Sequence, residues 1–325
     1  VAREREAGTL RVLMAQGTRP AQLVVGKLLT LAGVAAWMLA PAALALACIA
    51  ASASIPASLV LALGLGHAVW LLIWSVGIVG VSALCPRGRD ALVILLAVWT
   101  VSVVFLPRLA AELASSTHQL PTRFETDITV TRDLAAMGDS HDANDSYFDQ
   151  FRGQVLSRYG VSRVEDLPVN YKGLVGMESE RLTSALFDRY ANAGFALQEA
   201  QSRLVDSLSS LSPVIALRRL SMAAAGTDLH GYRRFLEQGE RHRYELIQAL
   251  NRLQAEALRY ADDKSSRDSR ISRAHWRGLA DFHLDPEPAA EVLQRAAPAA
   301  RVLVAWLIAL IVFVVFATRR LGRSA

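Results

Sequence analysis

Histidines are the side chains in this sequence best suited to metal chemistry, because imidazole is the commonest metal ligand in proteins. All but one of the seven histidines lie in one polar stretch, and these are His118, His141, His230, His242, His275 and His283. Only His230 and His242 fall on one expected helix, and their separation of 12 residues places them about 18 Å apart along its axis. Neither Cys48 nor Cys85 lies in that stretch. Because a metal ion binds its ligands at about 2 Å, the sequence predicts no metal site.

Two pairs of carboxylates, Glu178 with Glu180 and Asp262 with Asp263, are of the type that general acid–base catalysis uses. Neither pair has a nucleophile or a base pattern around it, so we interpret them as a solvated helix face and a charged loop. The sequence also lacks a Gly-x-x-x-x-Gly-Lys-Ser/Thr loop, which would cradle nucleotide phosphates. We therefore predict that the chain is not an enzyme and has no cofactor of its own.

A run of 59 residues between Lys27 and Arg87 contains no Asp, Glu, Lys or Arg. A buried soluble core does not need such a run, whereas a membrane span needs about 20 apolar residues. The sequence predicts an all-α membrane protein with four transmembrane helices, at about 28–51, 57–84, 91–107 and 302–318. Pro41 lies inside the first span, where a membrane helix tolerates it. The second span contains glycines that suit close helix packing, namely Gly64, Gly66, Gly77 and Gly80.

His67 is the one ionisable residue that lies well inside the first three spans. Such residues mark functional sites by default, which makes His67 a candidate intramembrane polar site. The alternative, which we favour, is a neutral imidazole that hydrogen-bonds across helices. Trp70 and Trp74 lie one turn apart on the same face, and we interpret them as packing residues.

Basic residues gather in three segments beside the spans: the first 27 residues, the turn at Arg87 and Arg89, and the tail from Arg319. The positive-inside rule places all three segments in the cytoplasm, and it explains the net charge of +5 without nucleic acid. The expected organisation is a cytoplasmic helix (1–20), three membrane helices (21–107), an extracytoplasmic domain (108–300), a last membrane helix (301–318) and a cytoplasmic tail (319–325).

The extracytoplasmic domain is expected to be mainly helical and free of disulfides, since it contains no cysteine. Apolar periodicity predicts a helix at 145–159 that ends at Gly160, and a long helix at 177–211. Ser212, as a cap, and Pro213 restart a helix, and Thr227-Asp228 begin another that runs to about 260. Residues 161–173 should form a loop or short strand, and residues 262–270 a charged loop. The prolines at 286, 288 and 298 should return the chain to the membrane without a long helix.

The first 20 residues are expected to form an amphipathic helix on the membrane surface. Its apolar side holds Ala7, Leu10, Leu13 and Met14, and the other side mostly Glu4, Arg5, Thr9 and Arg11. Gly26 and Lys27 then lead into the first span. One interpretation is a helix that simply lies on lipid, held there by its arginines.

The residues Glu4-x-Glu6-x-Gly8-Thr9-Leu10, followed by Leu13 and by Gly26-Lys27 at a membrane helix, resemble the coupling-helix signature of type-2 ABC transporter permeases. The resemblance implies a bacterial inner-membrane permease subunit that pairs with a second permease subunit. It also implies a separate ATPase subunit that holds ATP and Mg and docks on Glu4, Glu6, Gly8, Thr9, Leu10 and Leu13, with Leu10 as the buried anchor.

The second half resembles a family of bacterial permeases whose external domain has no assigned function. The residues that carry this resemblance are Leu167-Pro168-Val169-Asn170-Tyr171-x-Gly173, Ser212-Pro213 and Gly226-Thr227-Asp228 with Phe235. One departure is that type-2 permeases are expected to have six membrane helices, with the coupling helix between the second and third. We expect either that two preceding helices are missing from this sequence or that the chain cannot form a complete permease alone.

Two other functions remain open. The chain could transmit ATP-driven motion to an external partner without transport, because its spans are almost entirely apolar and offer no polar pathway. It could also be a membrane sensor with an external ligand domain, but only seven residues follow Thr318 and they cannot form an output domain, so we rank this last. The sequence reveals neither the substrate nor the direction of transport.

Overall fold

The computed structural model describes residues 1–53, 55–142, 144–259 and 272–324, in which every regular element is a helix. The chain divides into two compact units. The first comprises Val1–His118, Glu199–Tyr232 and Glu287–Ala325, and the second Gln119–Gln198 and Arg233–Pro286. The all-α class is therefore confirmed, but residues 199–232, expected in the external domain, belong to the same unit as the membrane helices. The expected charged loop at 262–270, with Asp262 and Asp263, lies outside the described residues.

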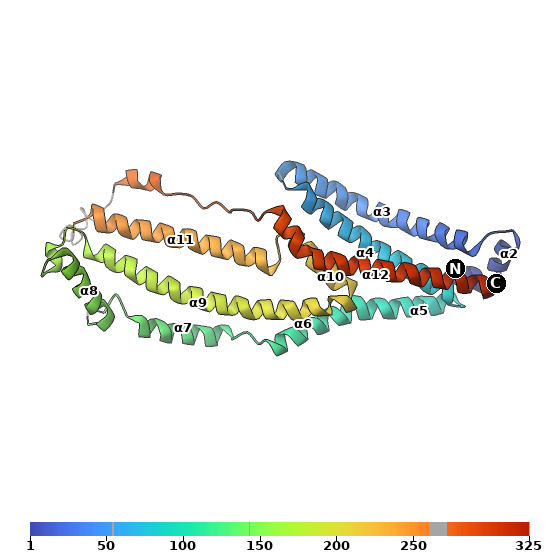
Figure 1. Ribbon diagram of the computed structural model, residues 1–325, viewed down its shortest axis with the longest axis horizontal. Coiled ribbons are helices and arrows are strands. Elements are labelled where there is room, and N and C mark those ends of the chain that lie inside the picture. Colours follow the sequence, from blue (N-terminus) through green and yellow to red (C-terminus); the bar gives the residue numbers. More distant parts are fainter. Residues whose placement is uncertain (54, 143, 260–271, 325) are drawn as a thin grey trace. The chain divides into compact units, whose positions relative to one another are not determined.

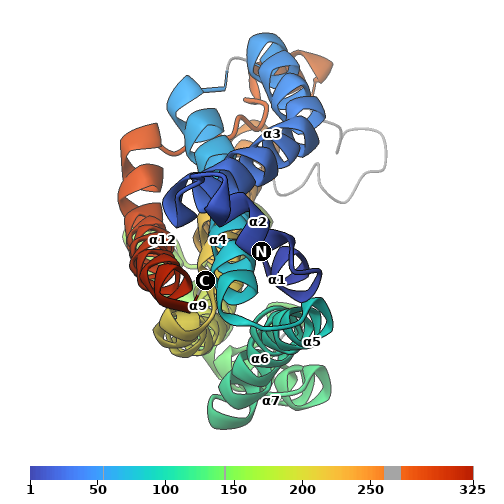
Figure 2. The ribbon, with the colours of Figure 1, turned by 90° about the vertical axis from the view of Figure 1, so that its right-hand side faces the viewer.

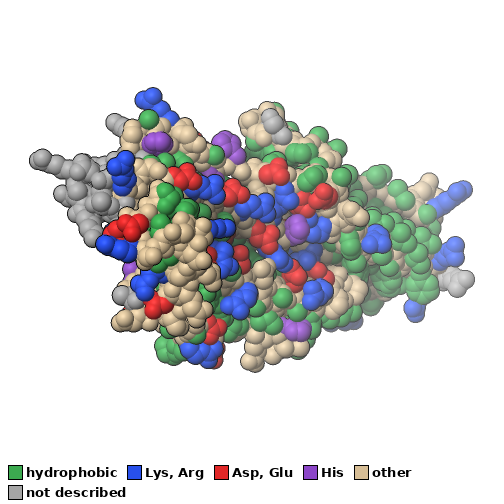
Figure 3. All heavy atoms as spheres, turned by 60° about the vertical axis from the view of Figure 1, so that its left-hand side comes forward, with side chains coloured by type: hydrophobic (Ala, Val, Ile, Leu, Met, Phe, Trp, Pro, Cys, Tyr) green, Lys and Arg blue, Asp and Glu red, His purple; other side chains and the backbone are tan. Residues whose placement is uncertain are grey.

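Four helices are long and apolar enough to cross a membrane: Pro20–Ala53 (α3), Ala57–Leu84 (α4), Gly88–Thr117 and Ala289–Gly322. The third combines α5 (Gly88–Trp99), the π-helical turn η1 (Thr100–Phe105) and α6 (Leu106–Thr117), and the fourth lies in α12 (Ala289–Ser324) (Figure 1). Hydrophobic side chains cover much of their surface (Figure 3). Each of the four predicted spans therefore lies in a helix that is long and apolar enough to cross a membrane.

The connection into the last span differs from the prediction. Pro298 lies inside α12, so the chain approaches the membrane as a helix rather than as an irregular segment. A proline in a helix removes one backbone hydrogen bond. On either side of it, Ala296 and Ala299 are 5% and 9% exposed, so this stretch of the helix is held by packing against its neighbours.

The third span contains a π-helical turn, which is wider than an α-helical turn. Pro107 follows it, and a proline ring crowds the carbonyl group four residues earlier, so a wider turn makes room for the ring. The hydroxyl of Ser212, a fully buried residue, donates to the carbonyl oxygen of Ser102 in this turn at 2.6 Å. Ser212 was expected to cap the following helix, but its side chain makes no capping bond there because it serves the π turn instead.

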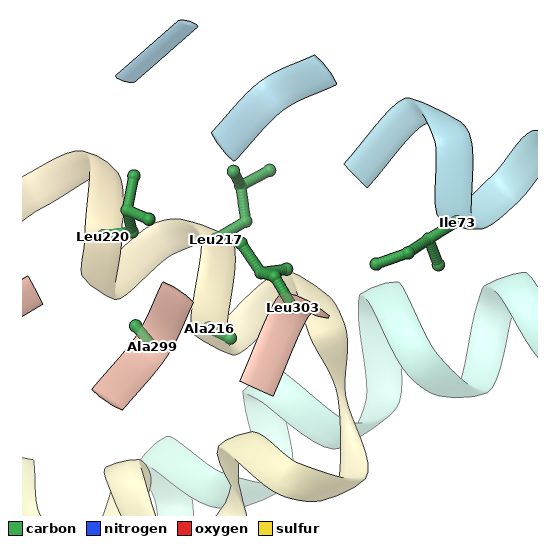
Figure 4. Close-up of a cluster of buried hydrophobic side chains, with 6 residues drawn as sticks. All are labelled: Ile73, Ala216, Leu217, Leu220, Ala299 and Leu303. Carbon is green, nitrogen blue, oxygen red and sulfur yellow. The ribbon is translucent and has the colours of Figure 1, made fainter. Parts of the chain in front are cut away.

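That following helix, α10 (Pro213–Ala224), packs among the membrane helices. Its residues Leu217 and Leu220 form one buried cluster with Ile73 of α4 and with Ala299 and Leu303 of α12 (Figure 4). This placement was not predicted, because α10 is too short to span a bilayer and carries two arginines.

Helices α4 and α12 approach each other closely at Gly80. A Cβ atom at this position would lie 2.7 Å from the ring of Phe313 and 3.0 Å from a methyl group of Val314. Only glycine fits between these two helices, as small residues do at many membrane helix contacts. The packing role predicted for the glycines of this span is therefore confirmed at Gly80. Gly64 and Gly77, in contrast, have no neighbour within 4 Å of a Cβ atom.

The second unit is built from α7 (Arg123–Met137), α8 (Ser146–Tyr159), the short helices Val164–Asp166 and Arg273–Gly278, and parts of α9 (Tyr171–Ser207) and α11 (Leu229–Ala257). Asp145 caps α8 by accepting from the amide of Phe148. The helix ends at Gly160, as predicted. α9 begins six residues before the expected position, at Tyr171. α7 was not predicted, although Thr122 and Glu125 form the capping box that announces it.

Candidate functional site

The segment that precedes the first span consists of two short helices, α1 (Ala2–Glu6) and α2 (Thr9–Ala15). A single amphipathic helix was expected. Gly8 separates the two helices because its φ of 73° lies in the left-handed region, which a right-handed helix cannot include and which residues with a side chain rarely adopt. The α1–α2 segment lies over the ends of the membrane helices (Figure 2).

Glu4 joins α1 to the first span. Its carboxylate forms an ion pair with Nζ of Lys27, at 2.5 Å. The ammonium group of Lys27 is the main reason that the pKa of Glu4 falls to about 2. Both side chains retain some exposure, 43% for Lys27 and 23% for Glu4, so solvent screens part of this attraction. The pair fixes the position of α1 against the first two turns of α3.

The next two residues join α1 to the adjoining ends of the second and third spans. Nη1 of Arg5 donates to the carbonyl oxygens of Leu84 and Cys85, at 3.3 and 3.2 Å, where α4 ends and its last carbonyl groups lack helical partners. Oε2 of Glu6 accepts from the amide of Gly88, at 3.0 Å, at the first residue of α5. An anion is stabilised at a helix N-terminus by the free amides and the helix dipole.

One hydrogen bond and one apolar contact complete the attachment of the α1–α2 segment to the membrane helices. The amide of Ala2 donates to Oγ of Ser82 in α4, at 3.0 Å. Leu10 is 4% exposed and packs with Ala83 of α4 and with Ala317 and Leu321 of α12. We expected Leu10 to anchor in a partner protein. In the structure this chain already buries it, so it anchors α2 to the last span instead.

Of the remaining residues of the motif, some contact the segment itself and others are exposed to solvent. The hydroxyl of Thr9 donates to the carbonyl oxygen of Glu4, at 3.2 Å across the turn at Gly8, and Leu13 is half-buried. The surface left open on this segment is formed by Arg3, Glu6, Ala7, Gly8, Thr9, Arg11, Val12 and Ala15, of which Val12 is 55% exposed. Val12 is the largest aliphatic side chain of this surface, and Arg11 precedes it in the chain. Of the two acidic residues that we expected to contact the ATPase, Glu6 is exposed, whereas Glu4 is half-buried and paired with Lys27.

The other predicted positions lie away from this segment. Gly26 is an ordinary helical residue with no neighbour within 4 Å of a Cβ atom. The Nδ1 atom of His67 lies 2.9 Å from the carbonyl oxygen of Leu63 on its own helix. The hydrogen bond of His67 is therefore within α4. We had favoured a hydrogen bond across helices, and that interpretation was wrong. Trp70 packs against the cluster around α10, in agreement with its interpretation as a packing residue.

Comparison with known proteins gives one match. The family model described as "Domain of unknown function (DUF3526)" matches residues 123–285, which are 163 of the 325 residues of the chain. The chain belongs to the DUF3526 family. No curated protein and no solved structure matches it.

Within the DUF3526 region, the carboxylates of Glu178 and Glu180 join neighbouring helices. Glu178 accepts from the hydroxyl of Tyr147 on α8 and from Nε of Arg181, at 2.9 Å for the latter, and Arg181 holds the pKa of Glu178 below its ordinary value. Glu180 pairs with Arg243 of α11, at 2.6 Å. Their side chains are only 17% and 16% exposed. Glu180 thus forms an ion pair between helices, whereas Glu178 pairs with Arg181 on its own helix and reaches α8 through the hydroxyl of Tyr147. The interpretation of these carboxylates as a solvated face was wrong.

A second ion-pair cluster lies in the first unit and was not predicted. Nε of Arg295 on α12 donates to Asp228, at 2.9 Å, and its terminal nitrogens bind Glu287. Asp228 also caps α11 through the amide of Gly231, at 2.9 Å, as predicted. The side chains of Asp228 and Glu287 are 8% and 10% exposed, and Arg295 holds the pKa of Glu287 below its ordinary value.

His230 lies 3.4 Å from Glu287 at the edge of the same cluster. Within the ranges described by the structure, no three or more His, Cys, Asp or Glu side chains group in a way that could hold a metal ion.

Proposed function

We propose that the chain is the membrane-spanning subunit of a type-2 ABC transporter, and that the α1–α2 segment is the element on which the partner ATPase acts. One observation carries the proposal. Three consecutive residues, Glu4, Arg5 and Glu6, contact the ends of three different spans, and Leu10 packs on the fourth. A displacement of this segment by a few ångströms would therefore load all four membrane helices at once.

The contacts assign a different role to each part of the α1–α2 segment. Glu4, Arg5, Glu6 and Leu10 connect the segment to the membrane helices, and the exposed face around Val12 receives the partner. ATP and Mg are held by the ATPase, which supplies the energy. The chain works beside a second permease subunit in the bacterial inner membrane, with the α1–α2 segment in the cytoplasm and the second unit, residues 119–198 and 233–286, outside. The basic residues beside the spans support this orientation.

A photo-crosslinking amino acid at Val12 tests the proposal directly. The full chain, produced in cells of its own organism, should crosslink through this position to a protein that carries a nucleotide-binding P-loop. The same amino acid at Ile128, which is 53% exposed on α7, is the control and should give no such product. A crosslink to the ATPase from Ile128, or none from Val12, would contradict the proposal.

The second candidate function is the transmission of ATP-driven motion to an external partner without transport. It is favoured by the apolar contacts between α3, α4 and α12, where Val24, Val76, Val79 and Val314 are buried together. No hydrophilic substrate could pass between these side chains as they stand. A complex that hydrolyses ATP in sealed vesicles and moves no cargo, while an external enzyme gains activity, would favour this second function.

A further inference from the structure

The second unit contains a groove between α8, α9 and α11 to which nothing above assigns a role. Its volume is about 620 Å³, within the range of 300–1,000 Å³ that is usual for small-molecule sites. Apolar side chains line much of it, namely Phe151, Val155, Leu174, Met177 and Ala249. An organic ligand with an apolar body could therefore enter without a large desolvation cost.

The rim of the groove carries more positive than negative charge that is free to bind a ligand. Arg158 and Arg252 line it, are exposed, and form no ion pair within the described ranges. Arg181 also lines the groove, but Glu178 neutralises it at 2.6 Å. Glu245 is the one carboxylate of the lining that has no such partner among the described residues. Two free guanidinium groups against one free carboxylate favour an anion.

A buried acceptor in the same lining needs a donor. Gln248 donates through its amide nitrogen to the carbonyl oxygen of Met177, at 2.9 Å, which fixes the orientation of the side-chain amide. Its Oε1 atom is then buried without any hydrogen-bond partner. A buried polar atom left in this state destabilises the protein. A ligand that brings an N–H or O–H group to Oε1 would remove that cost.

These three features define one class of ligand. We propose that the groove between α8, α9 and α11 binds an organic anion with an apolar or aromatic body and an N–H or O–H donor. The apolar lining receives the body, Arg158 and Arg252 bind the anionic group, and Oε1 of Gln248 accepts from the donor. Tyr159 and Tyr244 border the same groove and would contact an aromatic body edge-on or face-on. The inference does not depend on the proposed ATPase partner.

N-acetyl-L-phenylalanine is a suitable probe, because it has an aromatic body, one amide N–H and a carboxylate. The full chain in lipid nanodiscs should bind it saturably with a Kd of about 1 mM or tighter, which is usual for a ligand of this size, as measured by ligand-observed NMR. N-acetyl-L-phenylalaninamide, which lacks the charge, should bind at least about fivefold more weakly. The double substitution Arg158→Gln, Arg252→Gln should remove this preference for the acid. Arg241→Gln, on an exposed part of α11 outside the lining, is the matched control and should keep it.

A second comparison tests the buried acceptor. 3-Phenylpropanoate keeps the ring and the carboxylate but has no amide N–H, so the intact chain should bind it less tightly than the probe. Gln248→Leu should abolish this difference between the two ligands while its melting temperature stays at or above that of the unsubstituted chain. The proposal is overturned if no saturable binding occurs up to about 20 mM probe, well above the Kd expected from ligand size. It is equally overturned if the arginine double variant retains the preference for the acid, or if Gln248→Leu still discriminates between the two ligands.

Discussion

Gly8 gives a sharp test of the α1–α2 segment, because its substitution changes the backbone and little else. Its φ of 73° is unfavourable for any residue with a side chain, and no atom lies within 4 Å of where a Cβ atom would be. Gly8→Ala therefore introduces no clash, and its whole cost is the left-handed conformation, about 1–2 kcal/mol. If alanine instead relaxes to helical φ, α1 and α2 fuse, and Glu4, Glu6 and Leu10 cannot all keep their partners.

Either outcome raises the population in which the segment is detached. A loss of 1–2 kcal/mol corresponds to a roughly 5- to 30-fold change in an equilibrium constant. We expect hydrogen exchange of the peptide covering residues 9–15 to accelerate by about that factor, as measured by mass spectrometry in nanodiscs. Exchange in the DUF3526 region should not change. With the proposed partner ATPase present, stimulation of ATP hydrolysis should fall in parallel.

Two matched variants make the result decisive. Gly8→Asn should restore most of the protection, since asparagine tolerates the left-handed region better than alanine. Gly26→Ala, in the interior of α3 and equally free of neighbours, should leave protection unchanged or raise it, because alanine is the better helix former. Equal exchange in Gly8→Ala and the unsubstituted chain, or equal damage from alanine and asparagine, would refute the reasoning.

Three further predictions concern charged groups. Glu6→Lys places a cation at the N-terminus of α5, so it should destabilise the contact between α1 and α5 by about 1 kcal/mol. In a reconstituted complex it should lower the stimulation of ATP hydrolysis without unfolding the membrane helices. Unchanged stimulation would count against coupling through Glu6. Arg295→Met leaves the carboxylates of Asp228 and Glu287 buried without a cation, and chemical denaturation should show a loss of about 3–5 kcal/mol; a loss under about 1 kcal/mol would mean that the cluster is not held by charge. The ion pair between Glu4 and Lys27 stabilises the fold above the ordinary pKa of 4.5 and is lost as pH falls toward about 2. The unsubstituted chain should therefore be more stable than Glu4→Gln by under about 1 kcal/mol at neutral pH, and this difference in the free energy of unfolding should disappear across that pH range. A difference that stays constant with pH would disprove the ion pair.

The sequence predicted those parts of the fold that rest on composition and on local backbone chemistry. An uncharged run of membrane length leaves few alternatives to a span, and all four spans were found. Asp145 and Gly160 mark the ends of α8 because a capping side chain and a left-handed glycine act within one turn. In the candidate site, the motif from Glu4 to Leu10 drew attention to the segment that contacts all four spans.

The parts that were missed depend on contacts between residues far apart in the sequence. Leu10 has the same apolar character whether it is buried by a partner or by Leu321, and only the fold decides between them. α10 reads as an external helix because its two arginines mask an apolar face that α4 and α12 bury. By local rules, a proline at position 298 predicts the end of a helix. Packing of the residues on either side of it keeps α12 continuous. Gln248 gives no signal in sequence, because its unpaired oxygen arises from one bond to Met177.

The contact between Leu10 and Leu321 has a consequence for how the protein is made. The two residues are 311 positions apart in the chain, and at about 5–20 residues per second the ribosome needs between about 15 s and 1 min to cover that distance. Until the last span has been inserted, Leu10 has only part of its hydrophobic surroundings, while the ion pair of Glu4 with Lys27 forms within the first moments. The nascent chain therefore holds Leu10 in incomplete apolar surroundings for the whole interval between the synthesis of Leu10 and that of Leu321, and this end of the molecule can be assembled only after α12 has been inserted.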